Sequence, residues 1–440
     1  MSEYLSERFL RIPIKSPNSN IIEEVESQVL KQMMPGESPV RFAVTKSEGE
    51  IWNCDVGVQV GDERPESIFR INKRVGEDNS SFNAVMLVPT GIGAEIGGHA
   101  GDAAPAAALL AAACDTLITH PNVLNASDLI QVTSNTLYVE GSVITRLLMG
   151  SIRLQPTRAN RLLVLLHEHE DELFTNAAIN SVNAARAYYG LSVTEVVMID
   201  SRFKMATEYS PSGVAAGRIE GLDHIWEILD SRRGDFDAVA ISSIISAPLE
   251  FHHDYYEQHG DMVNPWGGVE AMLTHAISLK YDVPSAHSPM FDSREIAELD
   301  LGVVDPRMAA EVVSVTFLQC ILRGLQRSPH IIHHDRPTTG NAIGVESVSC
   351  LVIPDGCLGL PTLAAMHQGI PVIAVRENRN IMRNDLATLP WAEGQLTVVD
   401  NYWEAAGILL AFKNGVEPKS VRRPLSDVSV RHTITEGTVA

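Results

Sequence analysis

The chain has 440 residues, of which 45% are apolar and 20% charged, and this is the composition of a folded globular protein rather than a disordered one. Its formal net charge is −21, from 55 acidic and 34 basic side chains. A chain with this negative charge repels nucleic-acid phosphates, and no run of basic residues offsets the charge. We therefore do not expect nucleic acid as a partner.

The first 80 residues predict a small α+β unit. Alternating and β-branched runs indicate strands over residues 8–14, 40–47 and 51–60, and an amphipathic run indicates a helix over residues 21–33. No signal-peptide pattern precedes them and no apolar stretch is long enough to span a bilayer, which together predict a cytoplasmic protein without a membrane partner.

From residue 81 onward, short buried-type strands alternate with helix-length segments, a pattern typical of a mostly parallel sheet covered by helices. The Ser- and Gly-containing stretch 210–221 reads as a joint. We therefore expect an α/β fold of two Rossmann-like lobes, over residues 81–220 and 221–415, followed by a mobile tail over 416–440. A long apolar helix is expected from Met308 to Leu325, where it could face a core or a second copy of the chain in a homo-oligomer.

The first candidate site is the glycine-rich turn between a strand that ends near Val88 and a helix that begins after Asp102. Glycines let the backbone approach a ligand closely, and a helix N-terminus attracts an anion such as a phosphate or a carboxylate. Three titratable side chains in the same loop suit acid–base catalysis. The predicted catalytic residues here are Glu95, His99 and Asp102, and the predicted binding residues are Thr90, Gly91, Gly93, Gly97 and Gly98. A plain connection between strand and helix is the alternative.

The second candidate site follows another strand–glycine turn–helix pattern near residue 355. The helix start and the carboxyl end of the next strand form the usual ligand edge of an open α/β sheet. The predicted binding residues are Asp355, Gly356, Thr362, Arg376, Glu377, Asn378 and Arg379. Neither glycine turn matches a dinucleotide or P-loop fingerprint, so the sequence identifies no cofactor.

Cysteines and histidines offer two further possibilities. The five cysteines are too few and too scattered for a disulfide framework, but Cys114 and Cys357 could form a pair of catalytic thiols, one in each lobe. Three histidine-rich segments (167–172, 252–254 and 333–335) could supply metal ligands, yet their spacing matches no standard site. Buried cysteines and second-shell or surface histidines are the alternatives, and we predict no metal.

The runs VPTGIGAEIGGHAGDAAPA (residues 88–106), ITHPNVLNASD (118–128) and NTLYVEGS (135–142) resemble a family of conserved bacterial proteins known mainly as a domain of unknown function, over about residues 80–400. GIPVIAVREN (369–378) is similar to the C-terminal lobe of hexosamine 2-epimerases and related glycosyltransferases. That similarity implies a nucleotide against the helix start, although Asp355-Gly356 stands where those families carry Ser-Gly. DGCLGLPTL (355–363) resembles the second cysteine motif of aspartate and glutamate racemases, with Leu and Gly in place of Thr and Glu.

These patterns predict a small-molecule enzyme that binds an anionic metabolite in a cleft between two lobes. An isomerase, an epimerase or a transferase that uses the loop from Gly91 to Asp102 is the leading interpretation. The alternatives are a cofactor-independent racemase or lyase that uses Cys357, a metal-dependent hydrolase, and a binding protein without chemistry.

Overall fold

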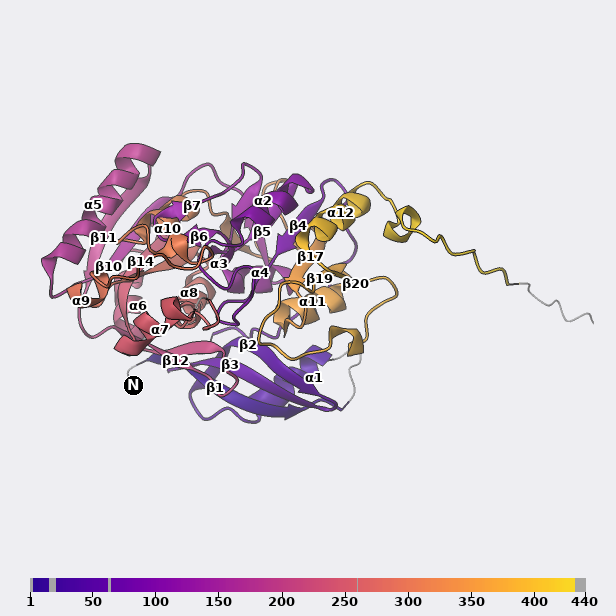
Figure 1. The fold of residues 1–440 in the computed structure, drawn as a ribbon, viewed down its shortest axis with the longest axis horizontal. Coiled ribbons are helices and arrows are strands. Elements are labelled where there is room, and N and C mark those ends of the chain that lie inside the picture. The colour runs from indigo at the N-terminus through magenta and orange to yellow at the C-terminus, as the bar shows by residue number, and fades with distance from the viewer. Residues whose placement is uncertain (1–2, 16–20, 62–64, 259, 432–440) are drawn as a thin grey trace, which may run out of the picture.

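The computed structural model describes residues 3–15, 21–61, 65–258 and 260–431, and it contains twelve α-helices among them (Figure 1). Two large sheets organise the molecule, a curled mixed sheet of ten strands and a parallel sheet of six. The predicted α/β class is confirmed. Two Rossmann-like lobes are not, because the larger sheet joins parallel strands to antiparallel ones.

The ten-stranded sheet combines the N-terminal strands with strands from the middle of the chain. Its β11, β10, β14 and β15 run parallel, and the remainder pair antiparallel apart from a short parallel contact between β12 and β14. In spatial order the strands are β11 (Ser192–Ile199), β10 (Arg161–His167), β14 (Ala238–Ser246), β12 (Lys204–Tyr209), β13 (Ala215–Glu220), β1 (Tyr4–Pro13), β3 (Ile51–Val60), β2 (Glu37–Glu48) and β18 (Leu358–Gly359), with β15 (Ser285–Met290) paired to β14. The N-terminal strands lie where the sequence predicted them, but they belong to this larger sheet.

The six-stranded sheet is parallel throughout and draws on two distant parts of the chain. Its order is β20 (Leu396–Val399), β19 (Val372–Val375), β17 (Val348–Pro354), β4 (Asn83–Met86), β5 (Thr116–Thr119) and β8 (Thr136–Tyr138). The chain runs outward from β4 in one direction and from β17 in the other. The carboxyl ends of β4 and β17 are therefore a topological switch point, where open α/β sheets bind ligands. Strands from both sides of residue 220 pair in each large sheet.

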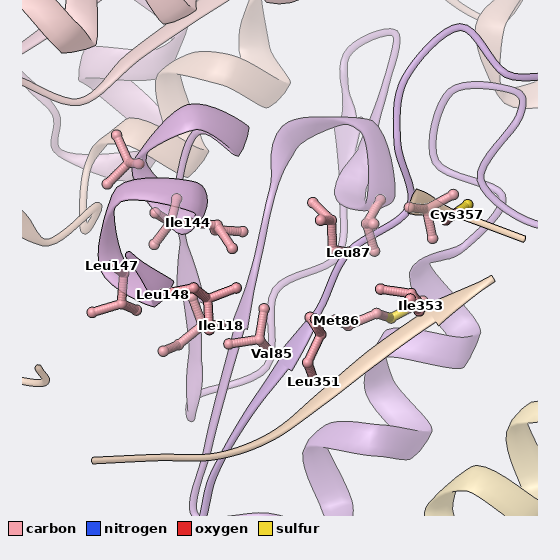
Figure 2. Packing of buried hydrophobic residues seen from close by; sticks show 14 of the residues in the cluster. Val85, Met86, Leu87, Ile118, Ile144, Leu147, Leu148, Leu351, Ile353 and Cys357 are labelled. Carbon is pink, nitrogen blue, oxygen red and sulfur yellow. The ribbon is translucent and has the colours of Figure 1, made fainter. Parts of the chain in front are cut away.

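Helices cover both faces of the parallel sheet, as its buried strands require. Helices α2 (Ala104–Ala112) and α12 (Tyr402–Lys413) contact each other, and so do α4 (Gly141–Leu148) and α11 (Leu360–Gln368) (Figure 1). Figure 2 shows the core between these strands and α4. Its labelled side chains are Val85, Met86, Leu87, Ile118, Ile144, Leu147, Leu148, Leu351, Ile353 and Cys357. Their full burial explains why β4 and β17 carry almost no polar residues.

Helix α8 (Gly267–Tyr281) lies between the two sheets. It contacts β13, β15 and β2 of the large sheet, and it also contacts helix α4, which covers the parallel sheet. The remaining elements are α1 (Ile21–Leu30), α3 (Pro121–Leu124), β6 (Asn125–Ala126), β7 (Leu129–Ile130), β9 (Ile152–Gln155), α5 (Glu172–Tyr189), α6 (Leu222–Asp230), α7 (Leu249–Glu257), α9 (Arg294–Ala297), α10 (Leu318–Leu325) and β16 (His330–His333), with 3₁₀ turns at Ala309–Glu311, Val345–Ser347, Leu386–Thr388 and Pro418–Val421.

The long helix expected from Met308 to Leu325 is wrong. Only a 3₁₀ turn (Ala309–Glu311) and α10 form, and residues 312–317 between them are not helical. Phe317 has a φ of 50°, which ends any helical path before α10. The intervening residues VVSVT (312–316) are mostly β-branched, and such residues have a low helix propensity, which favours an interruption at this point.

Candidate functional site

A cavity of about 300 Å³ lies where the carboxyl ends of the parallel strands meet the large sheet. Thr90 comes after β4, His120 directly after β5 and Glu140 shortly after β8, and all three line it. The opposite wall comes from the end of β14, from β15 and from α8, while the segment 299–317 adds a third side. Carboxyl ends of parallel strands meeting at one edge explain why polar groups from distant sequence positions converge here.

Glu140 and His275 form an ion pair across this cavity wall. Glu140 Oε1 lies 2.8 Å from His275 Nε2 on α8, and the same carboxylate caps α4 by accepting a hydrogen bond from the Ser142 amide. Burial raises the pKa of Glu140, but the charge and hydrogen bond of His275 and the bonds from Ser142 outweigh it and hold the pKa below its usual value. Glu140 is therefore ionised at neutral pH.

His120 is held as a neutral imidazole beside that pair. Its Nε2 accepts a hydrogen bond of 3.0 Å from the amide of Val88, so Nδ1 carries the proton. Complete burial lowers the pKa of His120 to about 4, even though the charge of Glu140 acts in the opposite direction. His120 can therefore donate a hydrogen bond through Nδ1 at neutral pH without bringing a charge into the cavity.

Glu311 contributes a second carboxyl group from the 3₁₀ turn of segment 299–317. It accepts hydrogen bonds from the Ala100 amide and from the Tyr255 hydroxyl, the latter at 3.1 Å. Tyr255 in turn lies 2.7 Å from Nδ1 of His99, a bond whose direction depends on the imidazole tautomer. Burial raises the pKa of Glu311 to about 7, although the bonds from Ala100 and Tyr255 lower it. A carboxyl group that titrates near neutrality can act as either acid or base.

Glu270 is a third carboxylate of the cavity, five residues before His275 on α8. Its Oε1 lies 3.7 Å from Nδ1 of the buried His287, whose Nε2 is 2.8 Å from the hydroxyl of Ser243. The Glu270 side chain is 23% exposed, so its carboxylate is open to the cavity while His287 lies behind it.

We expect the contribution of Glu311 to the free energy of unfolding to fall as the pH rises from about 5.5 to about 7.5. Burial raises the pKa of both Glu311 and Asp102 to about 7, so the folded protein binds protons there that the unfolded chain has released above about pH 4. The Glu311 share is about 2 kcal/mol over this window. In urea unfolding, the free energy of unfolding of the wild type relative to Glu311→Gln should therefore be lower at the higher pH. Relative to the exposed control Glu227→Gln it should be the same at both pH values. An unchanged difference between the wild type and Glu311→Gln would refute the prediction.

The predicted residues of the first loop divide between the cavity and its support. Thr90 lines the cavity, and His99 lies behind Glu311. Asp102 accepts a bond of 2.8 Å from the Gly97 amide and organises the loop, whereas Glu95 faces Arg307 at 3.3 Å.

The glycines of this loop make room for protein rather than for a ligand. Gly91 and Gly97 have positive φ, and a side chain on Gly91 or Gly98 would collide with the backbone of Ala215 or Ala94. The loop amides are also occupied: those of residues 95, 96, 97 and 100 donate to protein oxygens. An anion therefore has no set of free amides to bind at these four positions. Gly93 lies 3.0 Å, as measured from an added Cβ, from the Val263 side chain.

The second predicted segment packs against the first loop outside the cavity. Asn378 is fully buried and bonds both the amide and the carbonyl of Ile96, and the Arg379 carbonyl accepts from the Glu95 amide. The structure thus brings the two segments together at the switch point. None of the described cavity-lining residues belongs to the second segment, whose predicted members were Asp355, Gly356, Cys357, Thr362, Arg376, Glu377, Asn378 and Arg379.

Most of the other members of this segment serve local structure. Thr362 donates to the carbonyl of Cys357, and Gly356 donates its amide to the Asp355 carboxylate. Arg376 forms an exposed ion pair with Asp400, and Glu377 is exposed.

The cysteines are buried thiols. Cys357 lies among apolar side chains near Ile353 (Figure 2), and burial raises its pKa well above the usual range. Burial likewise raises the pKa of Cys114, to about 11. A nucleophilic cysteine needs a lowered pKa, so neither environment favours the thiolate.

The histidine-rich segments do not converge on a metal. Within the described part of the chain, no group of three or more His, Cys, Asp or Glu residues could hold a metal ion. His252 on α7 lines the cavity, whereas His333 pairs with Asp335 at 2.7 Å in a separate place. His167 and His169 are buried near the end of β10.

Sequence reasoning missed Glu140, His275, Glu270 and Glu311 as site residues. The sequence carried a signal for two cavity residues, because polar side chains at the ends of buried strands often form sites. His120, the last residue of the run ITH, directly follows one such strand, and Glu140, the last residue of the run YVE, lies shortly after another. Glu270 and His275 lie on a helix whose sequence resembles that of an ordinary buried helix, and Glu311 lies within a segment that was expected to be helical. No local sequence pattern identifies Glu270, His275 or Glu311 as site residues.

Comparison with known proteins places the chain among uncharacterised relatives. An uncharacterized lipoprotein of Synechococcus sp. (strain ATCC 27144 / PCC 6301 / SAUG 1402/1) is 34% identical to it over 346 residues, which cover 78% of this chain and 93% of that protein. No solved structure is significantly similar to the chain. The two weaker likenesses, to sugar-nucleotide enzymes and to racemases, stay predictions.

The name of that relative contradicts the cytoplasmic location that the sequence predicted. That prediction rested on the lack of a signal-peptide pattern and of an apolar stretch long enough to span a bilayer, and a lipid anchor holds a protein at a membrane without any spanning segment. Among the residues that the structure describes, no helix is both long and apolar enough to cross a bilayer.

Residues 83–422 match the family described as "Protein of unknown function (DUF3326)". This range contains the whole six-stranded parallel sheet and every described residue that lines the cavity. The chain belongs to that family.

Proposed function

We propose that this protein is a small-molecule enzyme that moves protons within the cavity, as an isomerase or epimerase does. The observation that carries the proposal is Glu311, a buried carboxyl group whose pKa of about 7 lets it exist in both protonation states at neutral pH. Its bond to Tyr255, and that of Tyr255 to His99, connects it to the glycine loop in which the sequence analysis placed acid–base chemistry.

An isomerase or epimerase needs one group to remove a proton and another to return one. Glu311 and the Glu140–His275 pair come from different elements around one cavity, which suits this division of labour. In the proposed reaction, one of them takes a proton from a carbon of the substrate and the other delivers a proton to that carbon or its neighbour, so that no oxidant or cofactor is consumed. His120 would hold the substrate as a neutral hydrogen-bonding partner. The parallel parts of the two sheets would then act as two Rossmann-like halves around the cavity.

We favour the isomerase class over a transferase because acid–base groups around one cavity can act on a single substrate. A racemase that uses Cys357 is less favoured because that thiol is buried in the core away from the cavity-lining residues. A binding protein without chemistry could use the same cavity and is therefore an outcome of the test.

The test is exchange of substrate hydrogen with solvent. The protein would be incubated in D₂O with pools of small polar metabolites, and mass spectrometry would follow the uptake of deuterium at carbon. We expect at least one compound to take up deuterium, with a loss of at least about 100-fold in Glu311→Gln and no loss in the control Glu227→Gln. Exchange that is equally fast in Glu311→Gln would remove Glu311 from the mechanism. Binding of a compound without exchange would identify a binding protein.

A further inference from the structure

The cavity has an unusual charge balance. Four carboxyl groups line it, those of Glu140, Glu270, Asp292 and Glu311, whereas no described residue of the lining is a lysine or an arginine. Glu140 contacts His275 Nε2 at 2.8 Å, whereas Glu270 lies 3.7 Å from the nearest ring nitrogen of His287. An anionic ligand would therefore enter a site without a permanent positive charge, and a cation would find at least one uncompensated carboxylate.

Aromatic rings form another part of the lining. Trp266 directly precedes α8, and the centre of its ring lies 5.0 Å from that of His252. Tyr256, Phe291 and Phe317 line the cavity as well. The faces of such rings attract cations, and the attraction grows when water is excluded. Aromatic walls combined with carboxylates are the arrangement that binds organic cations in preference to small inorganic ones.

A third observation points independently to a polar ligand. Several buried atoms of the lining have no hydrogen-bond partner among the described residues, including the hydroxyls of Ser127 and Ser288 and the side-chain oxygen of Asn125. Ser288 is 1% exposed and Ser127 is 4% exposed. Buried polar atoms are almost always hydrogen-bonded, so atoms left without partners beside a cavity indicate groups that a ligand satisfies. Asn125 Oδ1 can only accept, which calls for an N–H or O–H donor.

We infer that the substrate of this cavity is a small organic ammonium ion that carries N–H donors. Glu270 would neutralise its charge, the aromatic rings would cover its apolar part, and the oxygens of Asn125, Ser127 and Ser288 would accept its hydrogens. That this ligand is a substrate rests on the proposed function. The preference for a cation depends only on the residues that line the cavity. It replaces the anionic metabolite that the glycine turns suggested, because the lining carries no lysine or arginine among its described residues and four amides of the first loop already donate within the protein.

The experiment compares three probes of one shape and different charge: benzylamine, benzyl alcohol and benzoate. Their dissociation constants would be measured at neutral pH by ligand-observed NMR on the full chain, together with the variants Glu270→Gln and Glu227→Gln. We expect benzylamine to bind at least about tenfold more tightly than benzyl alcohol, and benzoate to bind most weakly. Glu270→Gln should weaken benzylamine about tenfold and leave benzyl alcohol unchanged, and Glu227→Gln on the surface of α6 should change neither.

The result for benzyl alcohol separates loss of the charge from loss of the fold, since a misfolded variant would lose both ligands. Benzoate or benzyl alcohol binding as tightly as benzylamine, or unchanged benzylamine binding by Glu270→Gln, would overturn the inference. Neither result bears on proton transfer, because deuterium uptake is measured separately. Conversely, preference for benzylamine without any deuterium uptake would leave this inference intact and refute the proposed function.

Discussion

We expect Gly268→Ala to lower the free energy of unfolding by about 3 kcal/mol or more. A Cβ atom at this position would lie 2.1 Å from the carbonyl oxygen of Ala215 and 2.8 Å from the amide nitrogen of Ala216, both backbone atoms of β13. Backbone atoms in the middle of a sheet cannot move aside as a flexible side chain can. On the facing strand, a Cβ on Gly217 would lie 2.6 Å from Val269, so glycines on both elements bring α8 close to β13.

The matched control is Gly407→Ala, on the exposed side of α12. An added Cβ there has no atom within 4 Å, so alanine should stabilise the protein by up to about 1 kcal/mol through its higher helix propensity. Both variants would be compared with the wild type by urea unfolding. A Gly268→Ala protein as stable as the wild type would show that α8 can move away from β13. Because α8 carries Glu270 and His275, a displaced helix should also weaken benzylamine binding.

We expect Glu140→Leu to lower the free energy of unfolding by about 3–5 kcal/mol at neutral pH. Glu140 is 4% exposed, and its removal would leave His275 without its carboxylate and the first turn of α4 without its cap. Breaking a buried ion pair by removing one partner is more damaging than never having formed it, since the remaining group stays desolvated.

The cap alone can be measured at Asn401, whose side chain caps α12 and accepts from the Glu404 amide without an ionic partner. Asn401→Ala should lower the free energy of unfolding by about 1 kcal/mol, and the excess at Glu140 is then due to the ion pair. The pKa of Glu140 is lowered in the folded protein, so its stabilisation is present above about pH 4 and is lost as the pH falls through the folded-state pKa. The difference between Glu140→Leu and the wild type should therefore shrink in acid. A Glu140 effect no larger than the Asn401 effect, or one that grows in acid, would contradict this account.

Much of the secondary structure could be predicted from local patterns. The apolar runs that became β4, β10, β14 and β17 are recognisable because strands buried on both faces contain almost nothing else. The two glycine turns were also recognised, and they do lie at the switch point of the parallel sheet. The sequence predicted that their glycines make room for a ligand, whereas those of the first turn make room for neighbouring protein atoms. Both kinds of glycine look the same in a sequence.

The site itself required the tertiary structure. His120 and Glu140 could have been found as polar residues at strand ends, but only the packing of α8 brings His275 to Glu140 from 135 positions further along the chain. Burial raises the pKa of Glu311, and its hydrogen-bond partners Ala100 and Tyr255 come from distant parts of the chain, so its environment depends on the whole fold.

By itself, the sequence determined the α/β class, the positions of most strands and helices, and membership in its family, because each depends on short-range patterns of apolar residues and glycines. The tertiary structure alone decided which strands pair, that residues 312–317 leave the helical path, and that the cavity is lined by carboxylates and aromatic rings instead of the glycine loop's amides. These properties depend on contacts between residues tens to hundreds of positions apart, and no local pattern records the burial and charge that such contacts create.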